Sequence, residues 1–344
     1  MIGKERGIPI VIFILEAILR RLPKNHVKYP IITEDLDRRW AGFRGEESLD
    51  YYLRSLPEKE TIIFHDLNFL DGDFNCQIDT LLLTTKLALI LEIKNMTGKL
   101  TFDTEHEQFF QNKDGNEKGY SDPIAQAQRH RKFIQKLLAE HHFPPVPVDY
   151  LVVISNSNAV LEFKGKNDKV IKRVCKSHSM LDRISLYEQK YKTDILTPKD
   201  LRKMTRFLVK SNTPPTKFLL QNYGIKKSEL KPGVYCPTCD YLPLTRVKLK
   251  WHCPSCNTFS KDAHVYTILD SFLLYDLKIT NQQFREFACV LSPDASGRML
   301  RSAELNYSGT NKGRYYFMDS FQLEKLALKY RNLRRALRNS DKFR

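Results

Sequence analysis

The chain has 344 residues, enough for two or three domains, at least one of them with a sizeable hydrophobic core. A hydrophobic content of 42% with 11% aromatic residues excludes a disordered chain. The net charge of +16 is uneven: residues 1–125 carry 16 Lys and Arg against 21 Asp and Glu, whereas residues 126–344 carry 40 against 19. Solubility alone does not require such an excess, and proteins use it to bind the phosphate backbone. We therefore expect nucleic acid as a partner, with a generic solvated surface as the alternative.

Residues 1–36 predict an N-terminal helix and a connector that ends near Pro30. The apolar run at residues 8–15 is stopped by Glu16 and then by two arginines, well short of the roughly 18–20 apolar residues that span a membrane. The arginine pair also makes a poor signal-peptide cleavage region. The run predicts a core or docking helix, with membrane-surface association as the weaker alternative and no integral membrane association.

Two apolar strand patterns, joined by a short connection at residues 84–86, are interrupted by Asp79 and by Glu92. Lys94 follows Glu92 by two residues, so both project from the same face of a strand. Paired as a hairpin, the strands would bring the three side chains together at one end of a sheet. Burying two acids and an amine is costly unless they pair or bind a cation.

This trio suits metal-assisted cleavage of a phosphodiester. Carboxylates such as Asp79 and Glu92 bind Mg²⁺ or Mn²⁺, the metal activates a water molecule, and Lys94 can position that water or stabilise the charge that develops on the phosphate. The alternative is purely structural: Asp79 caps a turn, and Glu92 and Lys94 form an ion pair at a strand edge.

Four motifs occur in order around the trio. They are G-x-x-G-E at residues 42–46, I-D at residues 78–79, E-I-K-N at residues 92–95 with a trailing Gly98, and P-x-x-Q at residues 123–126. Over roughly residues 37–155, this order resembles the nuclease-related domain (NERD), a family similar to the restriction-endonuclease-like PD-(D/E)XK superfamily. The resemblance implies an α/β fold with a mixed sheet flanked by helices. It implies Glu46 on the first helix, Asp79 and Glu92 as metal ligands, Lys94 as the catalytic base, and Gln126 turned toward the site.

Strand and helix patterns alternate through the rest of this region, which we delimit as an α/β domain at residues 37–210. Asp122 and Pro123 predict the start of a helix that runs to about residue 142. Residues 151–154 and 160–163 predict further strands of the same sheet. A capping box at residues 197–200 opens a helix that runs to about residue 209. Residues 211–232 are interpreted as a linker.

Two C-x-x-C knuckles follow, with thirteen residues between them: Cys236 with Cys239, and Cys253 with Cys256. Four thiolates in this spacing predict one tetrahedral structural Zn²⁺ in a zinc ribbon at residues 233–261. A redox dithiol would need only one knuckle, and His252 is interpreted as a bystander. Metal binding should supply the folding energy of so short a segment. The other three cysteines have no partner spacing, which favours a reducing, cytoplasmic compartment.

Residues 262–320 predict a winged-helix-like module, with a helical cap over the ribbon as the alternative. A capping box at Thr280 and Gln283 opens one helix, and Ser292 with Pro293 opens the next, although Asp294 and Gly297 are unusual in a basic recognition helix. A glycine-flanked basic tip at residues 308–314 would form the wing, and residues 321–344 a solvated basic helix. The residues expected to contact nucleic acid are Arg246, Lys248, Lys250, Arg298, Arg301, Lys312 and Arg314.

The combined prediction is a DNA-processing protein in which the α/β domain hydrolyses phosphodiester bonds and the C-terminal modules hold the DNA. The main alternative is a non-catalytic adaptor that uses a nuclease-like scaffold to bind nucleic acid, and a weaker one is a surface for membrane or protein docking. The chain has no G-x-x-x-x-G-K-[S/T] loop, which argues against an ATPase motor.

Overall fold

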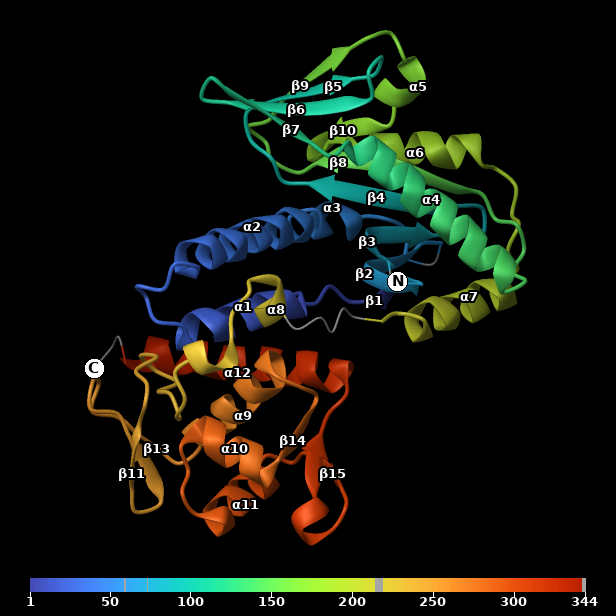
Figure 1. Cartoon of the computed structure of the whole chain (residues 1–344). Helices are drawn as coiled ribbons and strands as arrows, with labels where there is room; N and C mark the ends of the chain where they lie inside the picture. The colour runs from blue at the N-terminus through green and yellow to red at the C-terminus, as the bar shows by residue number, and fades with distance from the viewer. Residues whose placement is uncertain (59, 73, 214–218, 342–344) are drawn as a thin grey trace. The chain divides into compact units, whose positions relative to one another are not determined.

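The computed structural model describes residues 1–58, 60–72, 74–213 and 219–341 as a mixed α/β structure (Figure 1). The chain divides into two compact units. Unit 1 comprises Met1–Gly7 and Trp40–Pro215, and unit 2 comprises Ile8–Arg39 and Thr216–Arg344. Helix α2 (Tyr29–Glu47) contains the boundary between residues 39 and 40. The first seven residues thus fold with the α/β domain, although the sequence grouped them with the N-terminal helix.

Unit 1 is built on a six-stranded sheet with the order β1-β2-β3-β4-β8-β10. Its strands are β1 (Ile2–Lys4), β2 (Ile62–Asp71), β3 (Phe74–Leu83), β4 (Ala88–Lys94), β8 (Val148–Ile154) and β10 (Val174–Lys176). Strands β2, β3 and β4 pair antiparallel, whereas β1 with β2, β4 with β8 and β8 with β10 pair parallel. Strands β4 and β8 are nearly continuous apolar runs because both of their faces are covered.

Helices cover both faces of this sheet. Helices α4 (Pro123–Glu140) and α7 (Pro198–Lys210) share one hydrophobic cluster with the sheet. Helices α3 (Asp50–Leu53) and α6 (Met180–Lys190) share another cluster with the opposite face. Two short elements, α5 (Asp168–Ile171) and the 3-10 helix η1 (Ser177–Ser179), precede α6. The sheet of unit 1 is therefore mixed and flanked by helices, as the sequence predicted.

A second sheet with the order β7-β6-β5-β9 lies in the same unit (Figure 1). Its strands are β5 (Lys99–Asp103), β6 (Gln108–Lys113), β7 (Asn116–Tyr120) and β9 (Val160–Lys164). The prediction that residues 160–163 join the main sheet is wrong, since β9 pairs parallel with β5. Phe163 stacks on Phe102 with ring centroids 5.4 Å apart.

Unit 2 has a helical core around α9 (Ala263–Leu274), all of whose residues are buried. The apolar run near the N-terminus forms helix α1 (Ile10–Arg21), which packs in this core, as does α12 (Ser320–Asp341). The shorter helices are α8 (Leu219–Asn222), α10 (Asn281–Ala288), α11 (Pro293–Ser302) and the 3-10 turns η2 (Lys227–Glu229) and η3 (Asn311–Gly313). Among the described residues, no helix is long and apolar enough to cross a membrane.

Unit 2 also contains two small antiparallel sheets. One joins β11 (Thr245–Val247), β12 (Lys250–His252) and β13 (Phe259–Ser260). The other has the order β14-β16-β15 and joins β14 (Lys278–Thr280), β16 (Tyr315–Phe317) and β15 (Asn306–Ser308). The chain order in the latter half is thus α9, β14, α10, α11, β15 and β16, followed by α12.

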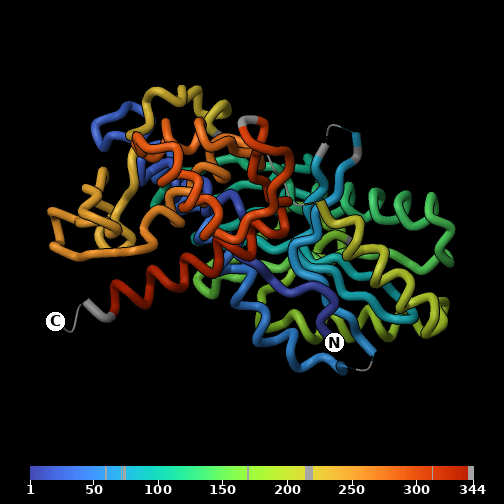
Figure 2. The backbone as a smooth tube through the Cα atoms, turned by 90° about the horizontal axis from the view of Figure 1, so that it is seen from below, coloured from blue at the N-terminus to red at the C-terminus, as the bar shows by residue number. Residues whose placement is uncertain are grey.

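Helix α12 differs from the solvated basic helix that the sequence predicted. Leu323 and Ala327 are buried in the core, and the helix is the red segment in Figure 2. Arg334 and Arg338 both form ion pairs with Asp240. Apolar residues at helical spacing hold one face of α12 against the unit, so only part of its surface is free to meet solvent.

Candidate functional site

The β3–β4 hairpin places Asp79, Glu92 and Lys94 at one end of the main sheet. Thr80 pairs with Leu91 in this hairpin, which leaves Asp79 and Glu92 at the adjoining positions. Glu92 is fully buried, and the Nζ atom of Lys94 lies 2.7 Å from its Oε1 atom. The Oδ2 atom of Asp79 accepts a hydrogen bond of 2.8 Å from the backbone N–H of Ile93. The hairpin thus brings the predicted trio together.

Helix α4 contributes two further side chains to this end of the sheet. Asp122 caps the helix by accepting hydrogen bonds from the backbone N–H groups of residues 124 and 125, and Pro123 occupies the first turn. Gln126 then accepts a 3.1 Å hydrogen bond from Lys94 through its Oε1 atom. One turn later, the Nδ1 atom of His130 lies 3.2 Å from Oε2 of Glu92. Sequence analysis missed His130, although its spacing of four residues from Gln126 puts both on one helix face.

Glu46 reaches the site from α2 and is held there by Arg6. The Nη1 atom of Arg6 lies 2.7 Å from Oε2 of Glu46, and its Nη2 atom lies 3.0 Å from Oδ1 of Asp50. The same guanidinium contacts Nδ1 of His65 at 2.7 Å and donates to Oγ1 of Thr80 at 3.2 Å. Its side chain is only 4% exposed. Arg6 was missed because it stands far from the motifs in sequence and no local pattern marks it.

The second glycine of the G-x-x-G-E motif, Gly45, is required because its neighbours leave no room for a side chain. A Cβ atom there would lie 2.4 Å from Cβ of Asn95 and 2.8 Å from Oγ of Ser155. Asn95 in turn donates a 2.7 Å hydrogen bond to the carbonyl oxygen of Ala41. Gly45 therefore lets α2 approach the end of β4, and this approach positions Glu46.

The acids of the site disfavour one another's ionisation. Burial raises the pKa of Asp79 well above its usual value, and the charges of Glu92 and Glu46 add to this effect. Burial also raises the pKa of Glu46 to about 7 despite the opposing charge of Arg6, with Asp66 and Glu92 contributing. The pKa of Lys94 is raised because Glu92 and Asp79 favour its charged form more than burial disfavours it.

These residues suit a hard divalent cation in their donor chemistry. Both carboxylate oxygens of Glu92 are buried, with Lys94 beside Oε1 and His130 beside Oε2, and mutually repelling carboxylates are the oxygen donors that Mg²⁺ prefers. The oxygens are nevertheless dispersed. Within the described ranges, four cysteines form the one group of three or more His, Cys, Asp or Glu ligand atoms that lie close enough together to hold a metal ion. Lys94 and Arg6 instead lie against Glu92 and Glu46.

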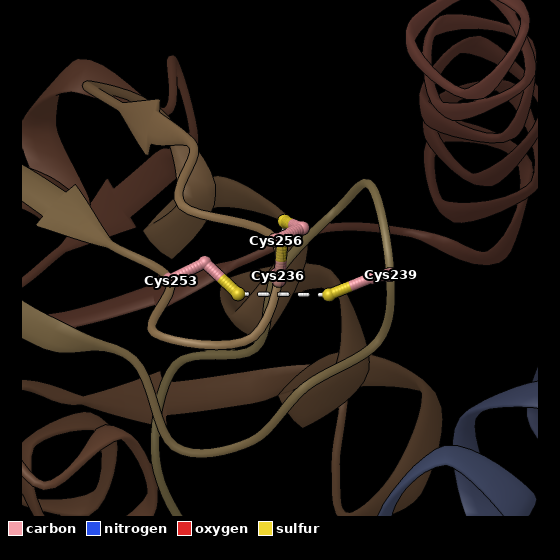
Figure 3. A group of neighbouring side chains, drawn as sticks. All are labelled: Cys236, Cys239, Cys253 and Cys256. Carbon is pink, nitrogen blue, oxygen red and sulfur yellow. Dashed lines mark hydrogen bonds between the residues drawn. The ribbon is translucent and has the colours of Figure 1, made fainter. Parts of the chain in front are cut away.

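That cysteine cluster lies in unit 2 and could bind zinc (Figure 3). The sulfur atoms of Cys236, Cys239, Cys253 and Cys256 all lie within 4.8 Å of one another. Two of the separations are 3.6 Å, for Cys236 and Cys256, and 3.5 Å, for Cys239 and Cys253. Tetrahedral zinc with Zn–S bonds of about 2.3 Å requires sulfurs about 3.8 Å apart. His252 lies outside the cluster, and its Nε2 atom lies 2.9 Å from Oδ1 of Asn257.

Most residues predicted to contact nucleic acid are exposed basic side chains of unit 2. Those exposed are Arg246, Lys248, Lys250, Arg298 and Arg301. Arg314 is half-buried, with its guanidinium 4.9 Å from the ring centroid of Tyr307, whereas the side chain of Lys312 lies outside what the structure describes. Burial and the charge of Arg298 lower the pKa of Arg246, so the β11–β13 sheet and α11 present these two cations near each other.

Gly297, which is unusual in a recognition helix, has a packing role. It is buried in α11, and a Cβ atom there would lie 3.4 Å from Nδ2 of Asn281 in α10. Asn281 also donates a 3.0 Å hydrogen bond to the carbonyl oxygen of Pro293. A small residue at this position thus leaves room for Asn281 of α10 and for the guanidinium of Arg301, whose Nη1 atom would lie 3.3 Å from such a Cβ atom.

Comparison with known families gave a match for one part of the chain. The family model of the nuclease-related domain matches residues 41–155. This segment of unit 1 contains Glu46, Asp79, Glu92, Lys94 and Gln126, as well as His130. Searches of curated proteins and of solved structures found no match. Arg6 and the cysteine cluster lie outside the matched segment, so the family match does not account for them.

Proposed function

We propose that the protein is a metal-dependent nuclease that hydrolyses phosphodiester bonds of DNA, with a restriction-endonuclease-like core in unit 1. The observation that carries the proposal is the environment of Glu92. This carboxylate is fully buried at the end of a central strand, Lys94 lies 2.7 Å from it, and its charge helps to raise the pKa of the two other acids, Asp79 and Glu46. Three buried carboxylates that disfavour one another's ionisation are costly to a scaffold, whereas a bound cation would offset their repulsion.

Each residue has a role in this proposal. Asp79 and Glu92 would hold Mg²⁺ or Mn²⁺, which when bound lowers the pKa of water and neutralises charge on the phosphate. Lys94 remains charged, since its pKa is raised, and therefore acts as a cation that orients water and phosphate rather than as a base. Gln126 fixes the lysine through its hydrogen bond. Glu46, with a pKa of about 7, is suited to accept or hold a proton at neutral pH.

The proposal assigns DNA binding to unit 2, through a zinc ribbon and a winged helix. Support for the ribbon comes from the four converging cysteines beside three short antiparallel strands. Support for the winged helix comes from the element order, with three helices, a three-stranded sheet and a connection between β15 and β16 that would form the wing. Helix α11 would enter the major groove, where Arg298 and Arg301 are exposed, and Arg314 would contact phosphate.

A non-catalytic adaptor is the second candidate, and one observation favours it. Cations of the chain already lie against the acids, with Lys94 at 2.7 Å from Glu92 and Arg6 at 2.7 Å from Glu46. Such pairs can stabilise a scaffold without any metal. In this case the nuclease-like unit would present nucleic acid to a partner and leave it uncut.

The deciding experiment measures cleavage of labelled linear, circular, single-stranded and branched DNA by the full chain with Mg²⁺ or Mn²⁺. Glu92→Gln keeps the shape of the side chain and removes the charge that would hold the cation, so cleavage should be lost while DNA binding persists. Glu47→Gln, an exposed neighbour of the site helix, is the matched control and should cut normally. If folded Glu92→Gln protein cuts at the wild-type rate, the trio is structural; if wild-type protein cuts none of these substrates, the adaptor replaces the nuclease.

A further inference from the structure

Unit 2 contains a basic cavity that is separate from the proposed winged-helix face. It has a volume of about 990 Å³ and is walled by α1, the first part of α2, α12 and the loop of the first cysteine knuckle. Of its described lining residues, seven are Lys or Arg and two are Asp or Glu. None of them belongs to α10, α11, β15 or β16. The cavity therefore concentrates positive charge at a place that the winged-helix proposal does not use.

The charge of this cavity comes mainly from one face of α12. Arg331, Arg334, Arg335 and Arg338 follow the spacing that puts side chains on a single helix face. Both acids of the lining already form ion pairs within the protein. Glu16 lies 3.5 Å from Arg331, and Asp240 pairs with both Arg334 and Arg338. Arg335 is exposed and makes no ion pair with any residue that the structure describes.

Like charges crowd one another in this cavity. Burial lowers the pKa of Arg331, and the charges of Arg335 and Arg334 lower it further, against the effect of Glu16. Lys24 and Lys231 add two exposed ammonium groups to the lining. An anionic ligand binds favourably to uncompensated cations, because the counterions condensed on the ligand are released when the cations neutralise its charge.

The lining also offers aromatic rings. Tyr241 and Tyr29 both border the cavity, and Tyr241 is 40% exposed. A cationic groove with accessible aromatic rings is the combination that proteins use to hold a nucleic-acid strand whose bases are unpaired. A duplex keeps its bases stacked inside and presents none of their faces to a tyrosine. An acidic peptide would use the arginines but would gain nothing from ring stacking.

We infer that this cavity binds single-stranded nucleic acid, with phosphates on the α12 arginines and an unpaired base on Tyr241. The inference rests on the proposed nucleic-acid partner and does not depend on hydrolysis. Together with a duplex on the α11 face, a strand in the cavity would make a junction between duplex and single strand the preferred ligand.

The test measures fluorescence anisotropy of a labelled oligothymidylate with the zinc-loaded full chain and no added Mg²⁺. Arg335→Glu should weaken binding at least tenfold and reduce the log–log salt slope by about 0.7 for each phosphate that the variant no longer neutralises. Tyr241→Ala should weaken it by about five- to hundredfold, and Tyr241→Phe should restore it, since stacking needs only the ring. The matched controls are Lys325→Glu on another face of α12 and Tyr51→Ala, an exposed tyrosine of unit 1.

The inference is overturned if Arg335→Glu and Tyr241→Ala, with zinc content and melting unchanged, bind the oligonucleotide as the controls do. It is also overturned if polyglutamate competes as well as single-stranded DNA of the same charge, because the site would then accept any polyanion. A chain that binds the strand as described but never cuts DNA supports this inference and refutes the nuclease. A chain that cuts DNA while both variants bind the strand normally supports the nuclease and refutes this inference.

Discussion

The raised pKa of Glu46 predicts an unusual effect of pH on the stability of unit 1. The pKa is about 7 in the folded protein against an ordinary value of 4.5. Because the folded value is the higher one, the stability contributed by the protonated carboxyl is fully present below pH 4.5 and is lost as pH rises through 7. Glu46→Gln, which keeps a neutral side chain at every pH, should therefore be spared this loss.

The magnitude follows from proton linkage. With pKa values of about 7 and 4.5, the destabilisation caused by ionising Glu46 grows by roughly 2 kcal/mol between pH 5.5 and pH 8.5. Wild-type unit 1 should thus lose about 2 kcal/mol more than Glu46→Gln between these pH values. Coupling acts in the same direction, since the charge of Glu46 also raises the pKa of Asp79.

The assay is urea unfolding at pH 5.5 and pH 8.5, followed by tryptophan fluorescence. The chain has two tryptophans, Trp40 in unit 1 and Trp251 in unit 2, so a Trp251→Phe background reports unit 1 alone. Glu47→Gln, exposed on the same helix, is the control for loss of one negative charge. The reasoning is refuted if Glu46→Gln and Glu47→Gln respond equally to pH. It is also refuted if Glu46→Gln loses more stability at pH 8.5, which would mean that the ion pair with Arg6 outweighs burial.

Three further predictions concern unit 2. Protein made without chelator should contain one equivalent of zinc by elemental analysis, and Cys253→Ser should lose it and lower the unfolding midpoint reported by Trp251 without shifting that of Trp40. Asp270→Ala should cost about 3–5 kcal/mol of unfolding free energy, because Asp270 is fully buried and pairs with Arg21 at 2.8 Å. As the control, Glu16→Ala removes the half-buried ion pair with Arg331 and should cost less than about 1 kcal/mol. Arg314→Ala should weaken binding to every duplex sequence alike and reduce the log–log salt slope by about 0.9, whereas equal salt slopes for variant and wild type would exclude a phosphate contact.

The sequence predicted the elements whose signals are local. Apolar runs defined β4 and β8, and the capping residues Asp122, Thr197 and Thr280 mark helix starts that the structure contains. Each of these signals lies within a few residues of the feature that it specifies, because a cap or a strand period is set by neighbouring side chains. Resemblance to a family added the order of the motifs and with it the placement of Gln126 beside Lys94.

Features that depend on distant contacts could not be predicted in this way. Strand β9 has an ordinary strand pattern, and only its pairing with β5 decides to which sheet it belongs. Arg6 joins the acids because the N-terminal strand β1 is added parallel to the edge of the sheet, beside β2. The basic cavity combines α1 with α12, which are about 300 residues apart in sequence. Pairing and packing over such distances leave no periodic signal.

The two candidate functions differ in what must happen to Lys94 and Arg6. A scaffold gains from these cations as they lie, and Mg²⁺ would only compete with them, so adding it at pH 8.5 should leave the unfolding of unit 1 unchanged. A nuclease must offer its carboxylate oxygens to the ion, and binding to the folded state alone raises stability by mass action, about 2.7 kcal/mol at a hundredfold excess over Kd. The gain should be larger at pH 8.5 than at pH 5.5, because protonated Asp79 and Glu46 are poor ligands. It should also vanish in Glu92→Gln. A nuclease therefore predicts stabilisation by Mg²⁺ that depends on both pH and Glu92, whereas a scaffold predicts no stabilisation by Mg²⁺.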